Sequence, residues 1–407
     1  MKMQEDIIVV GGGASGMVTA ILCARKGHSV LVLEHKKQLG KKILATGNGK
    51  CNYTNLHMEP ECFRSDVQGF VAPFLERFSA KEAIAFFEEL GITPKVKNGY
   101  VYPYAEQASA MVEVLRMELE RLKVQVVYEQ VVAVEEEQTG YLVRTQQQAY
   151  QGKYVVLATG GKASAKHGSD GSGLRIAKKM GHQISTPVPA LIGLHCMESF
   201  YSELAGIRMQ AKIWLYIDGA TKEIASEQGE LQLTKYGISG IPVFQVSRYA
   251  AKALAMGQQV EARIDFMPEF SKEELTELLL YRFGRKGRKV CEALVGLLPD
   301  KMIPVILQQS GIKKNMDVER VNEMQLKQLV QQLKWKKTEI VDTNGFEQAQ
   351  VTAGGVAVTE VSKENLESVL HKGLYFVGEI LDVDGICGGY NLQWCWTSAY
   401  IVSEAIG

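Results

Sequence analysis

Three glycines and one carboxylate near the start of the chain have the types and spacing of a dinucleotide-binding site. Gly11, Gly13 and Gly16 follow the apolar run at 7–10, and Glu34 comes about 20 residues later. Gly11 allows a tight turn from strand to helix, Gly13 lets backbone amides reach a pyrophosphate, and Gly16 allows close helix packing. Glu34 would accept hydrogen bonds from adenosine ribose hydroxyls and repel a 2′-phosphate, so NADP is not expected here. The motif leaves FAD and NAD open.

A second group of polar residues lies at 40–55, which is rich in glycine, asparagine and lysine. Glycine and asparagine tolerate positive φ, so this composition predicts an irregular loop that aims amides and carboxamides at a polar ligand. Lys41, Lys42 and Lys50 would meet the charge of phosphates.

The elements that must position these residues come from both ends of the chain. The run at 7–10 and the segment 29–34 read as buried parallel strands with a helix between them. A third apolar strand at 153–161 ends in a glycine turn, and the same pattern returns at 373–379. A helix follows, with Asn391 as its expected N-cap, and its N-terminus would stabilise negative charge on a reduced flavin. A plain Rossmann dehydrogenase needs no such returning strand, so the pattern favours FAD.

Between Pro187 and about Thr343 the alternation of strands and helices stops. Short β-like runs such as 212–217 and 260–265 come first, and a helical pattern begins at a capping box at Ser271. We therefore predict an α/β fold, a Rossmann-type FAD-binding domain of the two-dinucleotide-binding flavoprotein kind, with an inserted β-rich subdomain and a small helical subdomain. The expected domains are 1–188 with 346–407 (FAD binding), 189–268 (β subdomain) and 269–345 (helical subdomain and return strand).

The sequence resembles a family of bacterial flavoproteins, the NAD(P)/FAD-dependent oxidoreductases that include aminoacetone oxidases and a bile-acid-operon flavin reductase. The resemblance covers nearly the whole chain, and its last motif is the most specific. The motifs that carry it are the turn Gly11–Gly16, the loop Thr46–Asn52, the strand end Ala158–Gly161, and the segments Leu233–Pro242, Thr352–Val356 and Gly378–Gln393.

The resemblance implies a non-covalently bound FAD and a role for each matching residue. The glycine turn would contact the pyrophosphate, Glu34 the ribose, the backbone of Val131 the adenine, and Glu379 the ribityl or pyrophosphate portion. The segment 389–392 would meet the flavin ring. The full predicted set is Gly11, Gly13, Ala14, Ser15, Gly16, Glu34, Lys41, Lys42, Thr46, Gly47, Asn48, Cys51, Asn52, Val131, Thr159, Gly160, Gly161, Gly378, Glu379, Gly388, Gly389, Tyr390, Asn391 and Leu392.

The sequence departs from the family at two positions. Lys50 stands where relatives usually have arginine, which keeps the charge and loses the bidentate fork. Lys235 stands where relatives often have histidine, so a histidine acid or base is not expected there. His167, His182 and His195 are isolated and are interpreted as structural or surface residues, and no catalytic residue is assigned.

Composition and charge argue against nucleic-acid binding, membrane binding and a metal centre. The 407 residues carry 46 basic and 46 acidic side chains, and a net charge of zero gives no global attraction to nucleic acid or membranes. The basic cluster at 282–289 lacks interleaved aromatics and is interpreted as a solvated helix end. The seven cysteines form no Cys-x-x-Cys pair or zinc-ligand pattern, so we expect no metal centre and a reducing cytoplasm. We expect no signal peptide or membrane span, and the oligomeric state stays open.

These patterns predict a FAD-dependent oxidoreductase that transfers hydride at flavin N5 to or from a small organic substrate. Its redox partner would be NAD(P)H, as a transient co-substrate, or oxygen. The segment 168–173 is interpreted as a flavin-side turn before a helix, which leaves no second Rossmann site for NAD(P). Two alternatives stay open, a small-amine oxidase of the aminoacetone type and a non-catalytic FAD-binding redox or regulatory protein.

Overall fold

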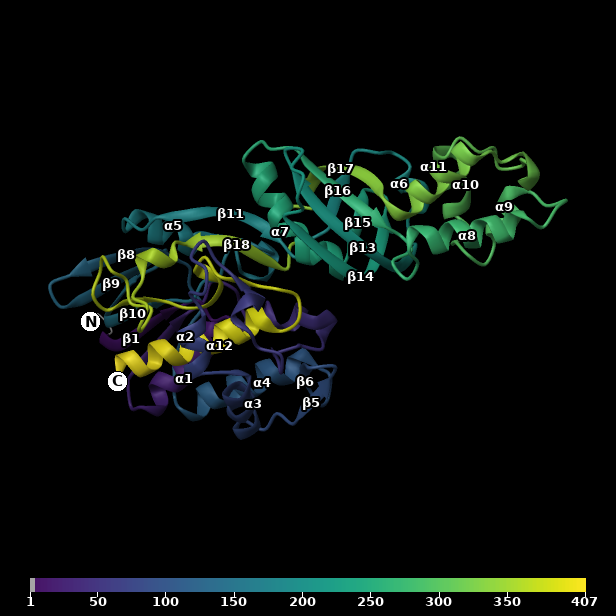
Figure 1. Ribbon diagram of the computed structural model, residues 1–407. Helices are drawn as coiled ribbons and strands as arrows, with labels where there is room; N and C mark the ends of the chain where they lie inside the picture. The colour runs from purple at the N-terminus through teal and green to yellow at the C-terminus, as the bar shows by residue number, and fades with distance from the viewer. Residues whose placement is uncertain (1–3) are drawn as a thin grey trace. The chain divides into compact units, whose positions relative to one another are not determined.

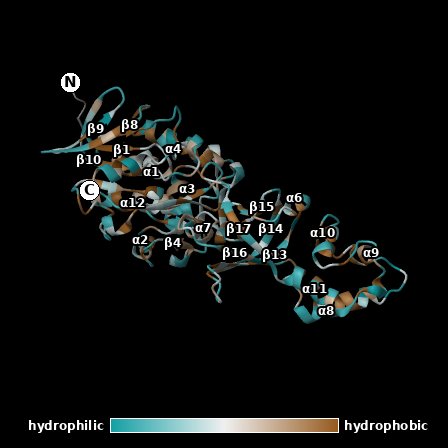
Figure 2. Ribbon diagram, turned by 90° about the horizontal axis from the view of Figure 1, so that it is seen from above, coloured by the Kyte–Doolittle hydropathy of each residue, from teal (hydrophilic) through white to brown (hydrophobic). Residues whose placement is uncertain are grey.

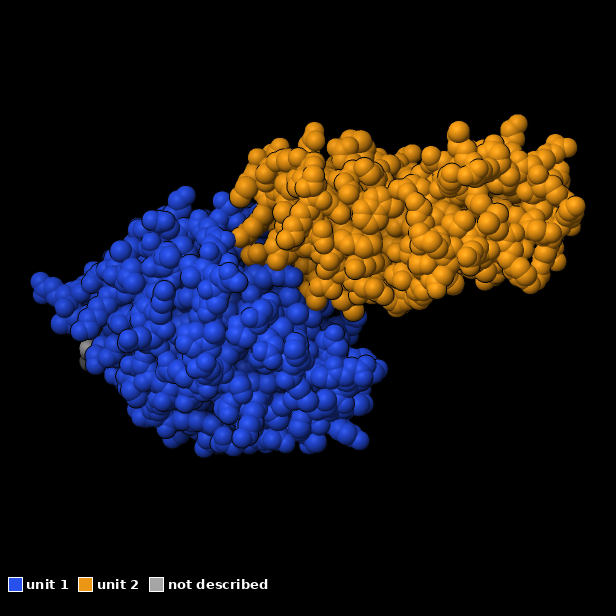
Figure 3. Space-filling view, viewed as in Figure 1, with its two compact units in different colours: residues 1–189, 346–407 blue, residues 190–345 orange. Residues whose placement is uncertain are grey.

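The computed structural model describes residues 4–407, which form two compact units (Figure 3). Unit 1 holds the residues up to Pro189 together with Phe346–Gly407, and unit 2 holds Ala190–Gly345. Each unit has its own hydrophobic core. Because unit 1 is built from both ends of the chain, unit 2 is an insertion within it.

Unit 1 is organised around a mixed sheet, seven-stranded within residues 4–407. Its path runs β7-β2-β1-β10-β9-β8, and β19 pairs with β10. The pairs of β1 with β2 and β10, of β2 with β7 and of β10 with β19 are parallel, whereas β8, β9 and β10 form an antiparallel meander. The strands are β1 (Gln4–Val10), β2 (Val30–Leu33), β7 (Gln125–Val127), β8 (Val131–Glu137), β9 (Gly140–Thr145), β10 (Ala149–Leu157) and β19 (Leu374–Phe376).

The centre of this sheet is apolar because helices cover it. The residues of β2 and the segment 7–10 of β1 are all buried, and Figure 2 shows brown, hydrophobic residues at β1. Helices α1 (Ala14–Arg25) and α12 (Tyr390–Ile406) pack against each other beside the sheet (Figure 1). Continuous burial of β-branched residues is what a parallel sheet between helices requires.

Further helices and strands surround this framework in unit 1. The helices are α2 (Ala72–Arg77), α3 (Ala80–Glu89), α4 (Ala108–Arg121) and α5 (Ser172–Lys179). The strands are β3 (Thr54–Asn55), β4 (Phe63–Arg64), β5 (Pro94–Lys97), β6 (Tyr100–Pro103), β11 (Ile184–Ala190), β18 (Val351–Val356) and β20 (Asp384–Gly385).

Unit 2 combines a closed β-barrel with a group of helices. The barrel order is β12-β15-β14-β13-β16-β17, and α7 (Ile241–Ala255) packs on it. The strands are β12 (Leu194–Cys196), β13 (Arg208–Ile217), β14 (Ala225–Thr234), β15 (Gly237–Gly240), β16 (Val260–Asp265) and β17 (Lys336–Thr343). The other helices are α6 (Tyr201–Leu204), α8 (Lys272–Phe283), α9 (Val290–Leu294), α10 (Met302–Gln309) and α11 (Glu323–Lys334). The expected capping box is present, since Ser271 and Glu274 exchange side-chain and backbone hydrogen bonds at the start of α8.

One local expectation is wrong. The N-cap of α12 is Gly389, in a left-handed conformation at φ 96°, and Asn391 lies inside the first turn. The Asn391 carboxamide instead accepts from the Gly385 N–H and donates to the Gly385 carbonyl, both at 2.9 Å. Asn391 therefore closes the loop before the helix, and the first-turn amides of α12 receive no side chain from the cap residue.

Within residues 4–407, none of the helices combines the length and the apolar character that crossing a membrane requires.

Candidate functional site

Unit 1 contains a cavity with about 1100 Å³ of empty space, part of it open to solvent. Its walls come from the turn after β1, the end of β2, the loop after β2, the start of β8, the end of β10, and the segments around α5, β18 and α12. The carboxyl ends of β1, β2 and β10 thus meet at one place, which is where open parallel sheets bind ligands.

The glycine turn lies on this cavity and leaves no room for a side chain at Gly11 or Gly16. Gly11 has φ +107°, and a Cβ on it would stand 2.6 Å from the Ala158 carbonyl oxygen. A Cβ on Gly16 would stand 1.9 Å from the Gly11 carbonyl oxygen, so α1 packs directly on the turn. A Cβ on Gly13, in contrast, would meet no atom within 4 Å. The backbone at Gly13 is therefore open to a ligand, as pyrophosphate binding requires.

Glu34 is held as a buried carboxylate at the end of β2. Its Oε2 accepts a hydrogen bond from the Gly12 N–H and its Oε1 one from the Lys36 N–H, both at 2.7 Å. Burial raises the pKa of Glu34, but the hydrogen bonds from His35, Lys36 and Gly12 outweigh it, so the pKa lies below its usual value. The carboxylate is therefore ionised at neutral pH.

Two helices present their N-termini to the cavity. Ala14 and Ser15 of α1 line it, as do Asn391 and Leu392 of α12. Both helices have glycine as N-cap and no acidic residue in the first turn. Glycine has no side chain to accept from the first-turn amides, so these N–H groups and the positive helix ends favour an anionic ligand.

A hydrogen-bonded group joins distant parts of the chain at the wall. Lys42 Nζ pairs with Glu379 Oε2 at 2.7 Å, and Glu379 Oε1 accepts from the Thr352 N–H at 2.8 Å. The Thr352 hydroxyl oxygen accepts in turn from the N–H groups of Lys162 and Ala163. Cys395 of α12 also lines the cavity, and burial raises the pKa of its thiol to about 12, so it is neutral.

The cavity unites more than half of the residues predicted from sequence. Those that line it are Gly11, Gly13, Ala14, Ser15, Glu34, Lys41, Lys42, Thr46, Val131, Thr159, Gly160, Glu379, Asn391 and Leu392. Those that do not are Gly16, Gly47, Asn48, Cys51, Asn52, Gly161, Gly378, Gly388, Gly389 and Tyr390.

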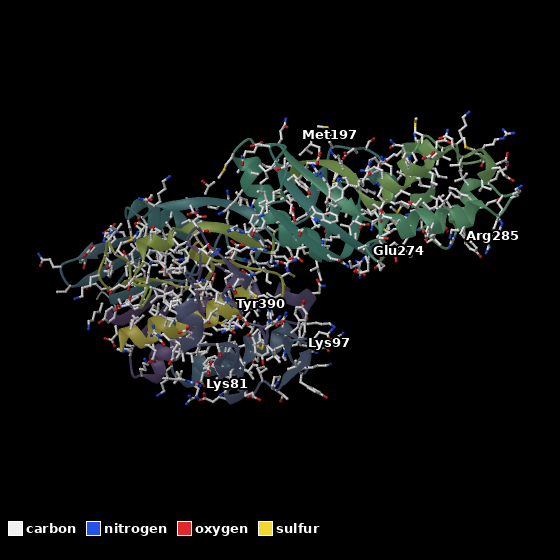
Figure 4. The ribbon with its side chains drawn as sticks, in the orientation of Figure 1. Lys81, Lys97, Met197, Glu274, Arg285 and Tyr390 are labelled. Carbon is white, nitrogen blue, oxygen red and sulfur yellow. The ribbon has the colours of Figure 1, made fainter. Side chains whose placement is uncertain are left out.

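Several predicted residues that do not line the cavity hold neighbouring parts of its wall in place. Asn52 Oδ1 accepts from the Val101 N–H, and the Gly378 N–H donates to the Ser398 hydroxyl. Cys51 is fully buried at φ 57°, and Tyr390, labelled in Figure 4, packs its ring edge-on against Phe63.

Other residues line the cavity although the sequence did not predict them as site residues. His35, Lys36, Glu129 and Gln130 adjoin the predicted Glu34 and Val131, so adjacency was the available signal. His167, which the sequence suggests is a structural or surface residue, lines the cavity beside the turn at 168–169 that precedes α5. Gln350 carries no signal in the sequence, because only the return of the chain from unit 2 brings it to this wall.

The residues present fit FAD. A buried carboxylate suits a ribose, the N-terminus of α1 and Lys42 suit a pyrophosphate, and the start of α12 suits the electron-rich part of a flavin ring. When bound, FAD supplies a two-electron carrier that gives or accepts hydride at N5.

Comparison with known proteins agrees with this fit. The family described as HI0933-like protein Rossmann domain matches residues 5–405. A 3-dehydro-bile acid delta(4,6)-reductase of Clostridium scindens is 42% identical over 406 residues, 99% of each chain. A ribosomal RNA dihydrouridine synthase of Haemophilus influenzae is 31% identical over 413 residues, covering 100% of this chain and 99% of the relative.

Two solved structures share the fold over 99% of this chain. One is the open conformation of a flavocytochrome c3 fumarate reductase, with a TM-score of 0.52, 14% identity and 78% of that chain covered. The other is the 3-ketosteroid-delta4-(5alpha)-dehydrogenase of Rhodococcus jostii RHA1 with 4-androstene-3,17-dione, with a TM-score of 0.50, 16% identity and 97% covered.

These matches confirm the resemblance to bacterial flavoproteins, the Rossmann-type fold class with its added β subdomain, and the class of FAD-dependent oxidoreductase. With nearly the whole chain matched, the protein belongs to the HI0933-like family of Rossmann-domain proteins.

Proposed function

We propose that the protein reduces a carbon–carbon double bond conjugated to a carbonyl group in a small organic substrate, with NAD(P)H as the electron donor. The observation that carries the proposal is the cavity of unit 1, where a buried ionised carboxylate and two uncapped helix N-termini form a site for FAD. The 42% identity with a protein named as a bile acid delta(4,6)-reductase supports a conjugated double bond as the target.

The chain's own groups have separable tasks in this reaction. Glu34 fixes the adenosine end through its ribose, because its two oxygens are already oriented by the Gly12 and Lys36 amides. Lys42 brings positive charge to the wall of the cavity, and Glu379 holds the Lys42 ammonium in place. The N-terminus of α12 would stabilise negative charge on a flavin ring bound beside it.

The test uses the purified holoprotein under anaerobic conditions. NADH or NADPH should bleach the absorbance near 450 nm, and a 4-en-3-one steroid should then restore it and appear as the saturated ketone by mass spectrometry. The matched control is the corresponding saturated 3-ketosteroid, which should restore nothing. Bleaching by aminoacetone and not by either nicotinamide would establish the amine-oxidase alternative instead. Absence of turnover with every donor would leave a non-catalytic FAD protein.

A second candidate substrate is a uracil base in ribosomal RNA. The observation that favours it is the likeness to two proteins named ribosomal RNA dihydrouridine synthase, from Haemophilus influenzae (31% identical) and Escherichia coli (29%). The double bond of uracil is also conjugated to a carbonyl, so the same site chemistry applies. The test is mass spectrometry of ribosomal RNA from cells with and without the gene, in which loss of a dihydrouridine supports this substrate.

A further inference from the structure

The helical part of unit 2 brings two basic segments together. Segment 284–289 connects α8 to α9, and segment 311–320 follows α10. The Val318 N–H donates to the Arg288 carbonyl at 3.1 Å, and the Val290 N–H donates to the Met316 carbonyl at 2.9 Å. The two segments therefore run side by side, although the sequence separates them.

Their combined charge is far from the average of the chain. The two segments hold seven basic and two acidic side chains, a net charge of +5 in a protein whose net charge is zero. The two acids are already engaged, since Asp317 pairs with Lys289 at 2.6 Å and Glu319 accepts from the Gly287 N–H. The hydrogen bond and charge of Lys289 hold the pKa of Asp317 below its usual value.

The remaining cations face solvent. Arg285, Lys286, Arg288, Lys313 and Lys314 are exposed, and within residues 4–407 none of the five forms an ion pair. Figure 4 shows Arg285 on this part of unit 2. Such a surface matches a polyanion with regularly spaced charges.

An exposed aromatic ring lies within the same surface. Tyr281, at the end of α8, is 66% exposed. The Arg285 guanidinium lies 5.2 Å from the ring centroid and donates to the Tyr281 hydroxyl at 3.0 Å. The basic cluster was interpreted as a solvated helix end because no aromatic interleaved with it. The structure adds that ring and a second basic segment, and a flat ring beside a guanidinium is a platform for stacking a base.

We propose that this surface, the basic tip (Tyr281, Arg285, Lys286, Arg288, Lys313 and Lys314), docks single-stranded RNA. The cations contact phosphates and Tyr281 stacks a base. RNA is favoured over an anionic membrane because the exposed Tyr281 ring is paired with the Arg285 guanidinium, an arrangement that suits the stacking of a base. The docking follows from the charges and the ring, and its link to catalysis rests on the second candidate function.

The experiment measures fluorescence anisotropy of a fluorescein-labelled 20-nucleotide single-stranded RNA with the holoprotein at two salt concentrations. Unmodified protein should bind at micromolar Kd in 50 mM salt and weaken steeply by 200 mM. The double variant Lys313→Glu/Lys314→Glu should lose about tenfold in affinity and reduce the salt slope by about 2. The matched control Lys81→Glu/Lys97→Glu reverses two exposed lysines of unit 1, labelled in Figure 4, and should change the affinity less than twofold.

The aromatic contact is tested in the same assay. Tyr281→Ala should weaken RNA binding about fivefold or more, the lower end of a base-stacking contribution. Tyr104→Ala is the control, because Tyr104 of unit 1 is 67% exposed and also lies near a cation, Lys95, at 5.6 Å. Equal losses in the tip and control variants would overturn the proposal, as would absence of RNA binding in 50 mM salt.

Two further readouts separate this proposal from the proposed function. The first readout is binding of the protein to vesicles with 30% phosphatidylserine. If the protein binds these vesicles through the same residues and more tightly than it binds RNA, the tip is a membrane-binding surface and the RNA proposal is overturned. Reduction of a 4-en-3-one steroid should be unchanged in every tip variant. If RNA binding depends on the tip while no reductase activity is found, the docking surface stands and the proposed function fails.

Discussion

Lys42 Nζ lies 2.7 Å from Glu379 Oε2, and this ion pair joins residues 337 positions apart at the wall of the cavity. Both side chains are mostly buried, with 25% and 14% of their surface exposed. The pair holds the loop after β2 against the segment before α12, so it fixes the Lys42 ammonium at the wall of the cavity.

Replacing Lys42 should expose the role of this pair. Lys42→Met leaves the Glu379 carboxylate unpaired beside the phosphates and should cost about 1.5–3 kcal/mol of FAD binding. The control Lys41→Met removes a charge from the same wall without orphaning a carboxylate, and its loss should be smaller. Titration of apoprotein with FAD measures both. Adding Glu379→Gln to Lys42→Met should recover part of the lost FAD affinity. If the double variant recovers none, the Lys42–Glu379 pair does not contribute to FAD binding.

Glu34 should govern affinity for FAD and not for riboflavin. Glu34→Ala removes the acceptor proposed for the ribose and should cost about 1.5–3 kcal/mol of FAD binding. Riboflavin has no adenosine, so its affinity should not change in the variant. Because the pKa of Glu34 is lowered, the carboxylate stays ionised as pH falls from 7 to 5, and FAD affinity should stay level over that range. Unchanged FAD affinity in the variant would falsify the ribose assignment.

His371 should make stability depend on pH. Its Nδ1 lies 2.7 Å from Glu136 Oε2 and its Nε2 lies 2.7 Å from the Met180 carbonyl oxygen, an arrangement that suits the imidazolium form. Burial lowers the pKa of His371, but the bonds to Met180 and Glu136 outweigh it and the pKa is raised. The resulting stabilisation is present in full below the unfolded pKa and is lost as pH rises through the folded one.

Urea unfolding at pH 5.5 and 8.5 tests this histidine. His371→Gln should destabilise the protein more at pH 5.5, by about 0.2–1 kcal/mol, the range of partly exposed ion pairs. Glu136→Gln keeps a hydrogen-bond acceptor and removes the charge, so it should flatten the same pH dependence. A larger effect at pH 8.5 would contradict the assignment.

The cysteines of the cofactor loops should not act as a redox pair. Cys51 is completely buried, and burial raises the pKa of its thiol to about 12, which leaves no reactive thiolate at neutral pH. The pKa of Cys387 is also raised by burial. The double variant Cys51→Ser/Cys387→Ser should reduce its flavin within about tenfold of the normal rate, roughly 1.4 kcal/mol of barrier. A much larger loss with FAD still bound would show that a thiol takes part.

Nicotinamide and substrate should share one site. We predict a single dinucleotide fingerprint, used by FAD, so NAD(P)H would bind weakly and transiently. An NAD(P)H-driven reaction should then give parallel double-reciprocal lines, with competitive inhibition by excess substrate. Intersecting lines, or sub-micromolar NADPH binding while substrate is present, would reject the shared site.

The sequence was most informative where the backbone geometry restricts which residue type a position can hold. Gly11 and Gly16 are readable because a Cβ would collide with nearby carbonyl oxygens, so only glycine fits. Glu34 is readable because the lengths of α1 and β2 fix its distance from the turn. A returning strand at 373–379 is predicted by its apolar, glycine-bounded pattern, and the structure pairs this strand, β19, with β10.

The features that the sequence did not predict depend on side-chain rotamers and on contacts between segments far apart in the chain. Asn391 has the residue type of a cap, but the preceding turn presents the Gly385 amide and carbonyl, and its side chain bonds to them instead. His167 and Gln350 reach the cavity through turns whose course no local pattern specifies. The basic tip needed the pairing of 284–289 with 311–320, which lies in hydrogen bonds between irregular segments.

The assembly of unit 1 from both ends of the chain constrains its synthesis. As the chain leaves the ribosome, β1, α1 and β10 emerge early, then all of unit 2, and only afterwards β19 and α12. Unit 2 has its own core and can fold during translation, whereas β10 must wait for β19, a partner encoded much later. Until β19 is made, the edge of β10 that later pairs with it is open to other strands. An unpaired strand edge of this kind can aggregate, so we expect chaperones to bind the nascent chain at this stage. Loading of the cofactor is consequently a late event, and a stop codon before Tyr390 would leave a protein with an intact barrel and an incomplete flavin site.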